Sequence, residues 1–227
     1  MKPITLLIAL LALGWLAYLA WEARCAAKAR ASLAHVVHVN GTRGKSTVSR
    51  LIEAGLRAGG LRVFCKTTGT DPMTIDVKGR EEPIHRRGKA NIKEQIAILR
   101  RAAAQKAQVL VVECMAVHPE YQDAAQHRIL KADTVVITNV RRDHTDVMGE
   151  TLPEICDALC STVPKNGVLF TAETAQAPRM GKKAAAMGSS FHPIRPDGSE
   201  PGFDFAENIA LALAVCEHLG VDRQTAL

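Results

Sequence analysis

The chain has 227 residues, of which 47% are hydrophobic and 4% aromatic, and its formal net charge is +6. This length suits one α/β domain, or a domain with a piece of another, and the scarcity of aromatic residues disfavours an all-β sandwich. The charge suits nucleic acid, an anionic membrane or phosphorylated substrates. Nucleic acid is disfavoured as a partner because the sequence has no Lys/Arg block and no basic face rich in aromatic residues. The six cysteines form no C-x-x-C pair, which indicates reduced, mostly buried thiols rather than a zinc site or a disulfide scaffold.

The N-terminal segment is apolar. Residues 3–21, PITLLIALLALGWLAYLAW, carry no charge, and a helix of this length, rising about 1.5 Å per residue, would cross a hydrocarbon core of about 30 Å. A buried core helix and a secretory signal are the alternatives, although the apolar part of a signal is usually shorter. We therefore expect a transmembrane anchor over residues 1–22 and a connector over residues 23–34.

Basic residues are unevenly placed around this segment. Arg24, Lys28 and Arg30 follow it, whereas only Lys2 and the terminal amine precede it. Because positive charge is retained on the cytoplasmic side of a membrane, this bias places the following domain, residues 35–227, in the cytoplasm. The expected location is the cell membrane, with a single pass.

Short apolar runs alternate with helical patterns through the rest of the chain and predict buried strands. The runs are HVVHV (35–39), LRVFCK (61–66), QVLVVEC (108–114), DTVVITNV (133–140) and GVLFT (167–171). This alternation predicts an α/β domain with a doubly wound, mainly parallel sheet. MTIDV and EEPIH predict a small hairpin between residues 67 and 90, and residues 205–221 predict a helix.

The stretch HVNGTRGKST, residues 38–47, lies between the first predicted strand and a helix expected to reach about Ala58. Gly41 and Gly44 would let successive backbone N–H groups turn toward one point, where the helix N-terminus and Lys45 add positive charge. This is a phosphate cradle of the short G-x-x-G-K-S form, in which Ser46 would hold Mg²⁺. The predicted nucleotide-binding residues are Asn40, Gly41, Thr42, Arg43, Gly44, Lys45, Ser46 and Thr47.

Two later motifs place polar side chains after predicted strands. Glu113 ends the strand in LVVECMA, and ITNVRRDHTDVMG follows the next strand. The carboxyl ends of parallel strands face the ligand crevice, so Glu113 is a candidate Mg²⁺ ligand, with an ordinary loop acid as the alternative. The second motif delivers Asn139, Asp143, His144 and Asp146 to the same edge, where a neutral imidazole is a possible ligand.

These three motifs, in this order, resemble the Mur ligase superfamily of ATP-dependent amide ligases, which also includes folylpolyglutamate synthase. A closer resemblance is to one branch. VNGTRGKSTVSRLIEAGLRAGGLRVFCKTTGT, RRGKANIKEQIAILRRAA, VVECMAVHPEYQ and VITNVRRDHTDVMG look like the membrane-associated poly-γ-glutamate synthase (PgsB/CapB) family. The resemblance covers nearly all residues from Val36 to the end and implies a P-loop fold of the Mur ligase central-domain type.

The resemblance implies a reaction and its residues. ATP phosphorylates a substrate carboxylate, and a glutamate amine attacks the acyl phosphate to form an amide. Lys45, Glu113 and His144 would be catalytic, Ser46 would hold the first Mg²⁺, and Glu113 and His144 a second metal. Asn139 and Asn208 would contact the nucleotide, with a helix-surface asparagine as the alternative for Asn208. The implied partners are glutamate, the poly-γ-glutamate chain, the membrane and small membrane-protein subunits.

Other basic residues are candidates for contact with the polyanionic glutamyl chain, although a solvated basic loop has the same sequence pattern. Together with two neighbouring threonines, the candidate residues are Lys66, Thr67, Thr68, Arg86, Arg87 and Lys89.

The sequence departs from the family in two ways. Residues 154–160, EICDALC, lack the modified lysine of many Mur ligases, and the relatives continue past Leu227 with a part that helps to close over ATP. A P-loop kinase and a non-catalytic nucleotide-binding anchor therefore remain alternative functions.

Overall fold

The computed structural model describes residues 3–86, 88, 90–198 and 205–227. Its centre is an eight-stranded sheet in the order β4-β3-β2-β5-β1-β6-β7-β8. β3 and β4 are antiparallel at one edge, whereas the other strand pairs are parallel. The strands are β1 (His35–Asn40), β2 (Val63–Lys66), β3 (Met73–Ile75), β4 (Glu81–Pro83), β5 (Val109–Glu113), β6 (Thr134–Ile137), β7 (Val168–Thr171) and β8 (Ser190–Pro193).

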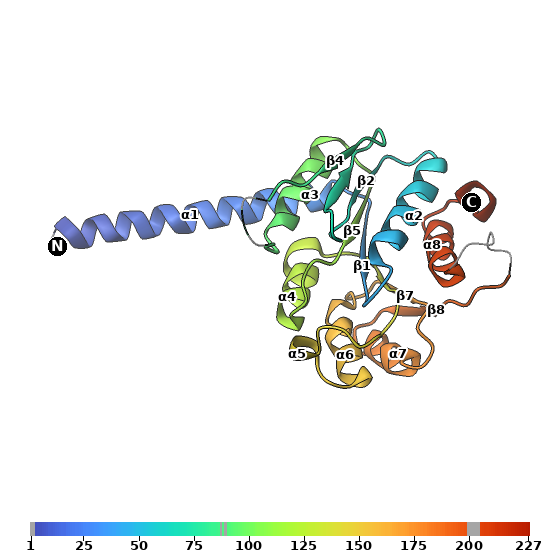
Figure 1. The fold of residues 1–227 in the computed structure, drawn as a ribbon. Helices are drawn as coiled ribbons and strands as arrows, with labels where there is room; N and C mark the ends of the chain where they lie inside the picture. Colours follow the sequence, from blue (N-terminus) through green and yellow to red (C-terminus); the bar gives the residue numbers. More distant parts are fainter. Residues whose placement is uncertain (1–2, 87, 89, 199–204) are drawn as a thin grey trace.

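Helices cover both faces of the sheet (Figure 1). The side chains of successive β1 residues lie on opposite faces of the sheet, since Val36 belongs to one hydrophobic core and Val37 to the other. Val37 packs in the core that α2 and α8 complete, and Val36 in the core that the end of α1, α3, η1, α6 and α7 complete. The bounds of the helices are α2 (Lys45–Ala58), α3 (Glu94–Ala104), α4 (Pro119–Ala124), η1 (Ala125–Leu130), α5 (Thr145–Met148), α6 (Leu152–Leu159), η2 (Cys160–Thr162), α7 (Ala177–Ala186), α8 (Ala206–His218) and α9 (Arg223–Ala226).

The predicted doubly wound sheet and the small hairpin are confirmed. The observed strands are shorter than several apolar runs, because apolar residues such as Val140 stay buried after the strand pairing ends. β8 was missed by the sequence analysis. It is a short edge strand whose residues are mostly exposed, so it lacks the apolar run by which the other strands were found. The thiols of Cys156 and Cys160 lie 3.9 Å apart in the buried core, as expected for packing.

The first helix, α1 (Pro3–Ala31), projects from the domain (Figure 1). It is long and apolar enough to cross a membrane, and its most apolar window is fully exposed. The helix continues past residue 22 through most of the segment 23–34. Ala29 and Leu33 are buried in the domain core, and the Arg100 guanidinium lies 5.6 Å from the Trp21 ring centre. The end of the apolar helix is therefore packed onto α3 rather than joined by a free linker.

Candidate nucleotide and acceptor site

The loop between β1 and α2 has the backbone shape that a phosphate cradle requires. Gly41 and Gly44 have φ values of 125° and 80°, in the region that favours glycine. A Cβ atom on Gly41 would lie 2.1 Å from Thr138 Oγ1 and 2.8 Å from the Thr138 nitrogen. Only glycine fits at position 41, because the end of β6 approaches the loop so closely.

The N-terminus of α2 is open toward this loop. Gly44 is its N-cap residue, and no side-chain hydrogen bond caps the helix. The first backbone N–H groups of a helix have no acceptor within the helix, so together with the helix dipole they favour an anion. Lys45 Nζ lies over the loop and donates to the carbonyl oxygens of Gly41 (2.7 Å) and Thr42 (3.1 Å).

The segment that follows β6 holds the loop in place. Asn139 accepts from the Arg43 N–H at 3.1 Å and donates to the Arg43 carbonyl at 3.1 Å. Thr138 Oγ1 donates to the same carbonyl at 2.7 Å, and the Arg141 N–H donates to Thr42 Oγ1 at 3.0 Å. Thr138 was missed by the sequence analysis, because a threonine within a β-rich run is unremarkable until the loop lies against it.

Ser46 and Glu113 meet at the edge of the sheet. Ser46 Oγ donates to Glu113 Oε2 at 2.7 Å, and the Thr68 N–H donates to the same oxygen at 2.7 Å. Parallel pairing places Glu113 opposite Val39, immediately before the loop. The two residues predicted to bind Mg²⁺ from separate motifs are therefore in direct contact.

His144 lies on the same side of the loop as Glu113. The two line a cavity of about 220 Å³, together with Lys45, Thr68 and Arg86. His144 has a positive φ of 48° and begins α5. Its neighbour Asp143 forms an ion pair with Arg43 at 3.2 Å, which ties this turn to the phosphate loop. The structure thus brings the Glu113 and His144 motifs to one cavity.

A larger cavity of about 980 Å³ lies on the other side of the loop. Asn139 and Asn208 line it with Arg43, Gly44 and Thr47. Asn208, near the start of α8, lies against the loop, since its Oδ1 is 3.0 Å from where a Cβ atom on Gly44 would be. One loop therefore separates two cavities, and the predicted site residues are divided between them.

Other predicted residues are placed differently. The Asn40 side chain is buried and donates to Gln122 Oε1 at 2.7 Å, while its Oδ1 accepts from the Gly41 N–H, so it shapes the loop from behind. Lys66 is fully buried and Thr67 is buried. Arg86 reaches the smaller cavity. Arg87 and Lys89, the other basic residues of that set, lie outside the described residues.

The donor set around Glu113 fits Mg²⁺ better than a soft metal. Among the described residues, no group of three His, Cys, Asp or Glu side chains is placed to hold a metal. Mg²⁺ is usually bound by one or two protein oxygens together with phosphates and water. The Ser46 hydroxyl and the Glu113 carboxylate, 2.7 Å apart beside an open helix N-terminus, offer that kind of site.

A sequence profile of the Mur ligase middle domain matches residues 39–191, the part that carries the loop, Glu113 and His144. The chain belongs to the Mur ligase family. It is 40% identical over 217 residues to the capsule biosynthesis protein CapB of Bacillus anthracis and 39% identical over 201 residues to the PGA synthase CapB of Bacillus subtilis. These alignments cover 91% and 84% of the chain but only 46% and 51% of the relatives. The resemblance to the poly-γ-glutamate synthase branch is thereby confirmed, over about half of the relatives' length.

Solved structures share the fold at lower identity. A mutant of L. casei FPGS has a TM-score of 0.69 at 16% identity, over 90% of this chain and 65% of that one. E. coli FolC in complex with ADP has a TM-score of 0.66 at 17% identity, over 94% and 63%. A bifunctional folylpolyglutamate synthase/dihydrofolate synthase with Mn, AMPPNP and L-glutamate bound has a TM-score of 0.63 at 17% identity, over 91% and 60%. The predicted Mur ligase fold is therefore confirmed.

Proposed function

We propose that this chain carries the nucleotide-binding and phosphoryl-transfer part of an ATP-dependent amide ligase that makes poly-γ-glutamate. The observation that carries the proposal is the contact between Ser46 of the phosphate loop and Glu113, which lines the smaller cavity. The relatives named CapB and the solved ligase with AMPPNP and L-glutamate bound support this assignment.

ATP would occupy the larger cavity, with its phosphates at the loop. The N–H groups at the start of α2 and Lys45 would bind the phosphates, and Asn139 and Asn208 would contact the nucleotide. Phosphoryl transfer depends mainly on positioning and on neutralising charge. Bound Mg²⁺, held by Ser46 and Glu113, would supply part of that neutralisation.

The acceptor carboxylate would enter the smaller cavity, where His144 and Glu113 would hold a second metal. The carboxylate oxygen attacks the γ-phosphorus of ATP, ADP leaves, and the resulting acyl phosphate is attacked by a glutamate amine to form the amide and release phosphate. Lys45, between the loop carbonyls and this cavity, is placed to stabilise charge on the transferring group.

Substitutions of Glu113 and His144 test this assignment in an assembly that turns over ATP. Glu113→Ala and His144→Ala should bind ATP nearly normally but lose glutamate-dependent phosphate release by roughly 100-fold or more, because each removes a group that stabilises transition-state charge. Glu120→Ala, which removes an exposed acid on α4, is the matched control. Near-normal turnover in both test variants would exclude the second-metal assignment.

Two alternatives give different products. A small-molecule kinase that phosphorylates a hydroxyl would stop at a phosphate ester, which hydroxylamine does not convert, whereas a ligase forms an acyl phosphate that hydroxylamine traps as a hydroxamate. A nucleotide-binding membrane subunit would bind ATP without any turnover. Trapping with hydroxylamine in the presence of Mg·ATP and oligo-γ-glutamate therefore separates the three functions.

We also propose that α1 anchors the chain in the cell membrane, with the domain on the cytoplasmic side and small membrane proteins as partners. Its exposed apolar window supports the anchor, and the basic residues after residue 21 support the orientation. The protein should stay in the membrane fraction in carbonate and in high salt, because burial rather than charge holds the helix. Release of the chain by salt alone would contradict the anchor.

A further inference from the structure

A buried cluster of charged side chains lies beside the smaller cavity. Lys66, at the end of β2, has a fully buried side chain whose Nζ lies 3.0 Å from Glu94 Oε1. Arg86 donates to the same carboxylate through Nε at 2.8 Å and Nη2 at 3.1 Å. One carboxylate is thus shared by two cations from segments that are distant in the sequence.

The cluster has more positive than negative charge. Lys66 and Arg86 contribute two positive charges and Glu94 one negative charge, so the trio retains a net charge of +1 when all three are ionised. Burial lowers the pKa of Lys66, although Glu94 acts in the opposite direction. Burial would raise the pKa of Glu94, but the hydrogen bonds from Arg86 and Lys66 outweigh it, and the pKa is lowered. Glu94 is therefore ionised at neutral pH and neutralises only one of its two partners.

Arg86 and Lys66 also have N–H donors that Glu94 does not occupy. A guanidinium carries five N–H donors and an ammonium carries three. Arg86 uses two donors on Glu94. Lys66 contacts one carboxylate oxygen and, at 3.6 Å, the weakly accepting thioether sulfur of Met115. Arg86 and Met115 both line the smaller cavity with Glu113 and His144.

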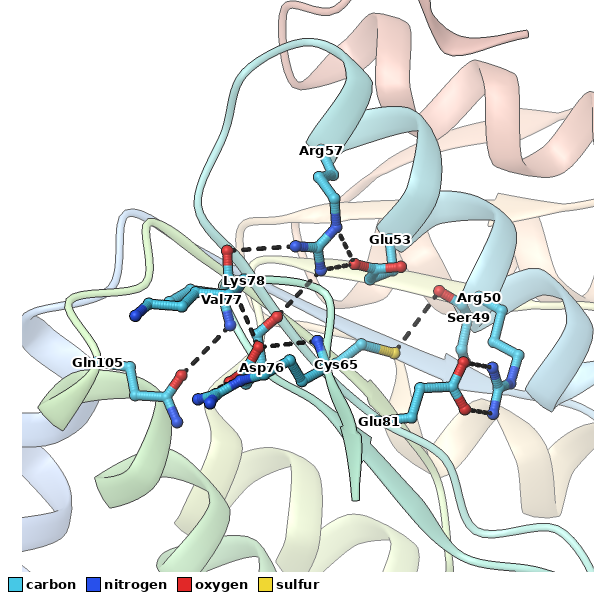
Figure 2. A network of polar contacts seen from close by, with 11 residues as sticks. Ser49, Arg50, Glu53, Arg57, Cys65, Asp76, Val77, Lys78, Glu81 and Gln105 are labelled. Atoms are coloured by element: carbon cyan, nitrogen blue, oxygen red, sulfur yellow. Dashed lines mark hydrogen bonds and ion pairs between the residues drawn. The ribbon is translucent and has the colours of Figure 1, made fainter. Parts of the chain in front are cut away.

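The hairpin that precedes Arg86 is firmly attached to the helix that follows the phosphate loop (Figure 2). Arg50 of α2 forms two hydrogen bonds, of 2.7 and 2.8 Å, with Glu81. Arg57 pairs with Glu53 and donates to the carbonyl oxygens of Asp76 and Val77 at 3.0 and 3.2 Å. Figure 2 shows these side chains reaching from α2 to the hairpin. The segment that carries Arg86 therefore follows a hairpin that is fixed to α2, the helix that begins with Lys45 and Ser46.

We propose that Arg86 forms a carboxylate-binding subsite that receives a carboxylate of the glutamyl substrate in the smaller cavity, while the buried Lys66 shares Glu94 with it. The inference rests on the proposed function, because it places the subsite beside the acceptor of the phosphoryl group. A guanidinium binds a carboxylate through paired N–H groups, whereas a phosphate is bound at the loop by backbone N–H groups and Lys45. Glu94 sets the strength of the subsite, since it competes with the substrate carboxylate for Arg86.

Binding of oligo-γ-glutamate to the detergent-solubilised chain, measured by calorimetry in the presence of Mg²⁺ and a non-hydrolysable ATP analogue, tests the proposal. Arg86→Gln should weaken oligo-γ-glutamate binding about 10-fold or more, the scale of a lost charged hydrogen bond. Lys66→Met should weaken it less, because Glu94 is then neutralised by Arg86 alone. Glu94→Gln should strengthen it, because the competing carboxylate is removed. Arg179→Gln is the matched control, since Arg179 forms the same kind of two-point pair with Asp157 and lines neither cavity.

Nucleotide binding is measured in the same samples and should be unchanged in all four variants. Oligo-γ-glutamate binding that is absent in the parent chain, or unaffected by Arg86→Gln, would overturn the subsite. Equally strong competition by inorganic phosphate would show a general anion site and would also overturn it. If the parent chain does not bind the nucleotide, the proposed function is contradicted. That outcome is distinct from failure of the subsite, because nucleotide binding and oligo-γ-glutamate binding are measured separately. Arg86 is partly exposed, so Arg86→Gln decides the question even if a buried variant fails to fold.

Discussion

The two cavities that flank the phosphate loop are built in different ways. The larger cavity is lined by the loop, the end of β6, the residues after β7 and β8, and the start of α8. The loop is held there by hydrogen bonds between backbone groups and neutral side chains. The smaller cavity is lined by side chains from several distant segments, and its charged groups are placed by ion pairs such as Arg86 with Glu94. Hydrogen bonds to neutral side chains thus fix the loop on the proposed nucleotide side, whereas ion pairs organise the proposed acceptor side.

Because of this difference, the two cavities should respond differently to pH and to side-chain substitution. The groups that hold the loop, which are backbone groups and the Thr42, Thr138 and Asn139 side chains, do not titrate near neutral pH. A cluster of buried charges responds to the loss of any one member, since the others are left without a partner. Substitutions on the nucleotide side should therefore act through shape, and those on the acceptor side through charge.

The largest effect is expected at the lysine that lies over the phosphate loop and lines the smaller cavity. Lys45→Ala should weaken Mg²⁺-dependent ATP binding by about 100-fold or more, because a charged hydrogen bond to phosphate is lost, while the fold stays intact. A fluorescent ATP analogue measures the affinity, and Lys182→Ala, a change at an exposed lysine on α7, is the control. Unchanged affinity in Lys45→Ala would show that the loop does not bind phosphate.

Two glycine substitutions test the claim that shape governs the loop. Gly41→Ala should lower the free energy of unfolding by roughly 3 kcal/mol, because strain at positive φ adds to a clash with the backbone and side chain of Thr138. Gly60→Ala also has a positive φ but nothing within 4 Å of its added Cβ, so it should cost only about 1 kcal/mol. Chemical denaturation followed by circular dichroism compares them, and equal losses would contradict the close approach.

A buried histidine should make the stability of the domain sensitive to acid. His38 of β1 is buried, donates one hydrogen bond from Nδ1 to Gln126 Oε1 at 2.9 Å, and has its pKa lowered to about 4 by burial. Between pH 6.5 and 4 the unfolded chain binds a proton there that the folded chain does not, so stability falls as pH falls, by at most about 3 kcal/mol.

Denaturation midpoints measured across this pH range check the effect. His38→Gln should flatten the loss of stability, whereas His85→Gln, at an exposed position, should not. His218, whose pKa is also lowered by partial burial, contributes in the same window and stays in both variants. An unchanged slope in His38→Gln would exclude His38 as the source.

The smallest effect is expected at the rim of the larger cavity. Asn208→Ala should weaken ATP binding about fivefold, the value of one hydrogen bond of about 1 kcal/mol, and should leave oligo-γ-glutamate binding unchanged. Both affinities are measured by calorimetry on the same variant. A loss confined to oligo-γ-glutamate would reverse the assignment of the two cavities.

The sequence alone predicted the parts of this protein that depend on short-range patterns. Apolar runs predicted the buried parallel strands, and the glycines with Lys45 and Ser46 predicted a loop between β1 and α2. These features are local, because periodicity and positive φ are properties of neighbouring residues. The apolar segment before residue 22 was also evident, although the continuation of its helix to Ala31 depends on packing against α3.

The tertiary structure decided what lies on each side of the loop. Lys66 and Arg86 were both expected to face the glutamyl chain, but the fold buries Lys66 and gives it Glu94, a residue with no sequence signal of its own. Asn40 was expected beside the nucleotide, yet its side chain turns to Gln122. Ion pairs and buried hydrogen bonds join residues far apart in the chain, and one pattern of charges is compatible with many such pairings. Only the packing of the sheet and its helices selects among them.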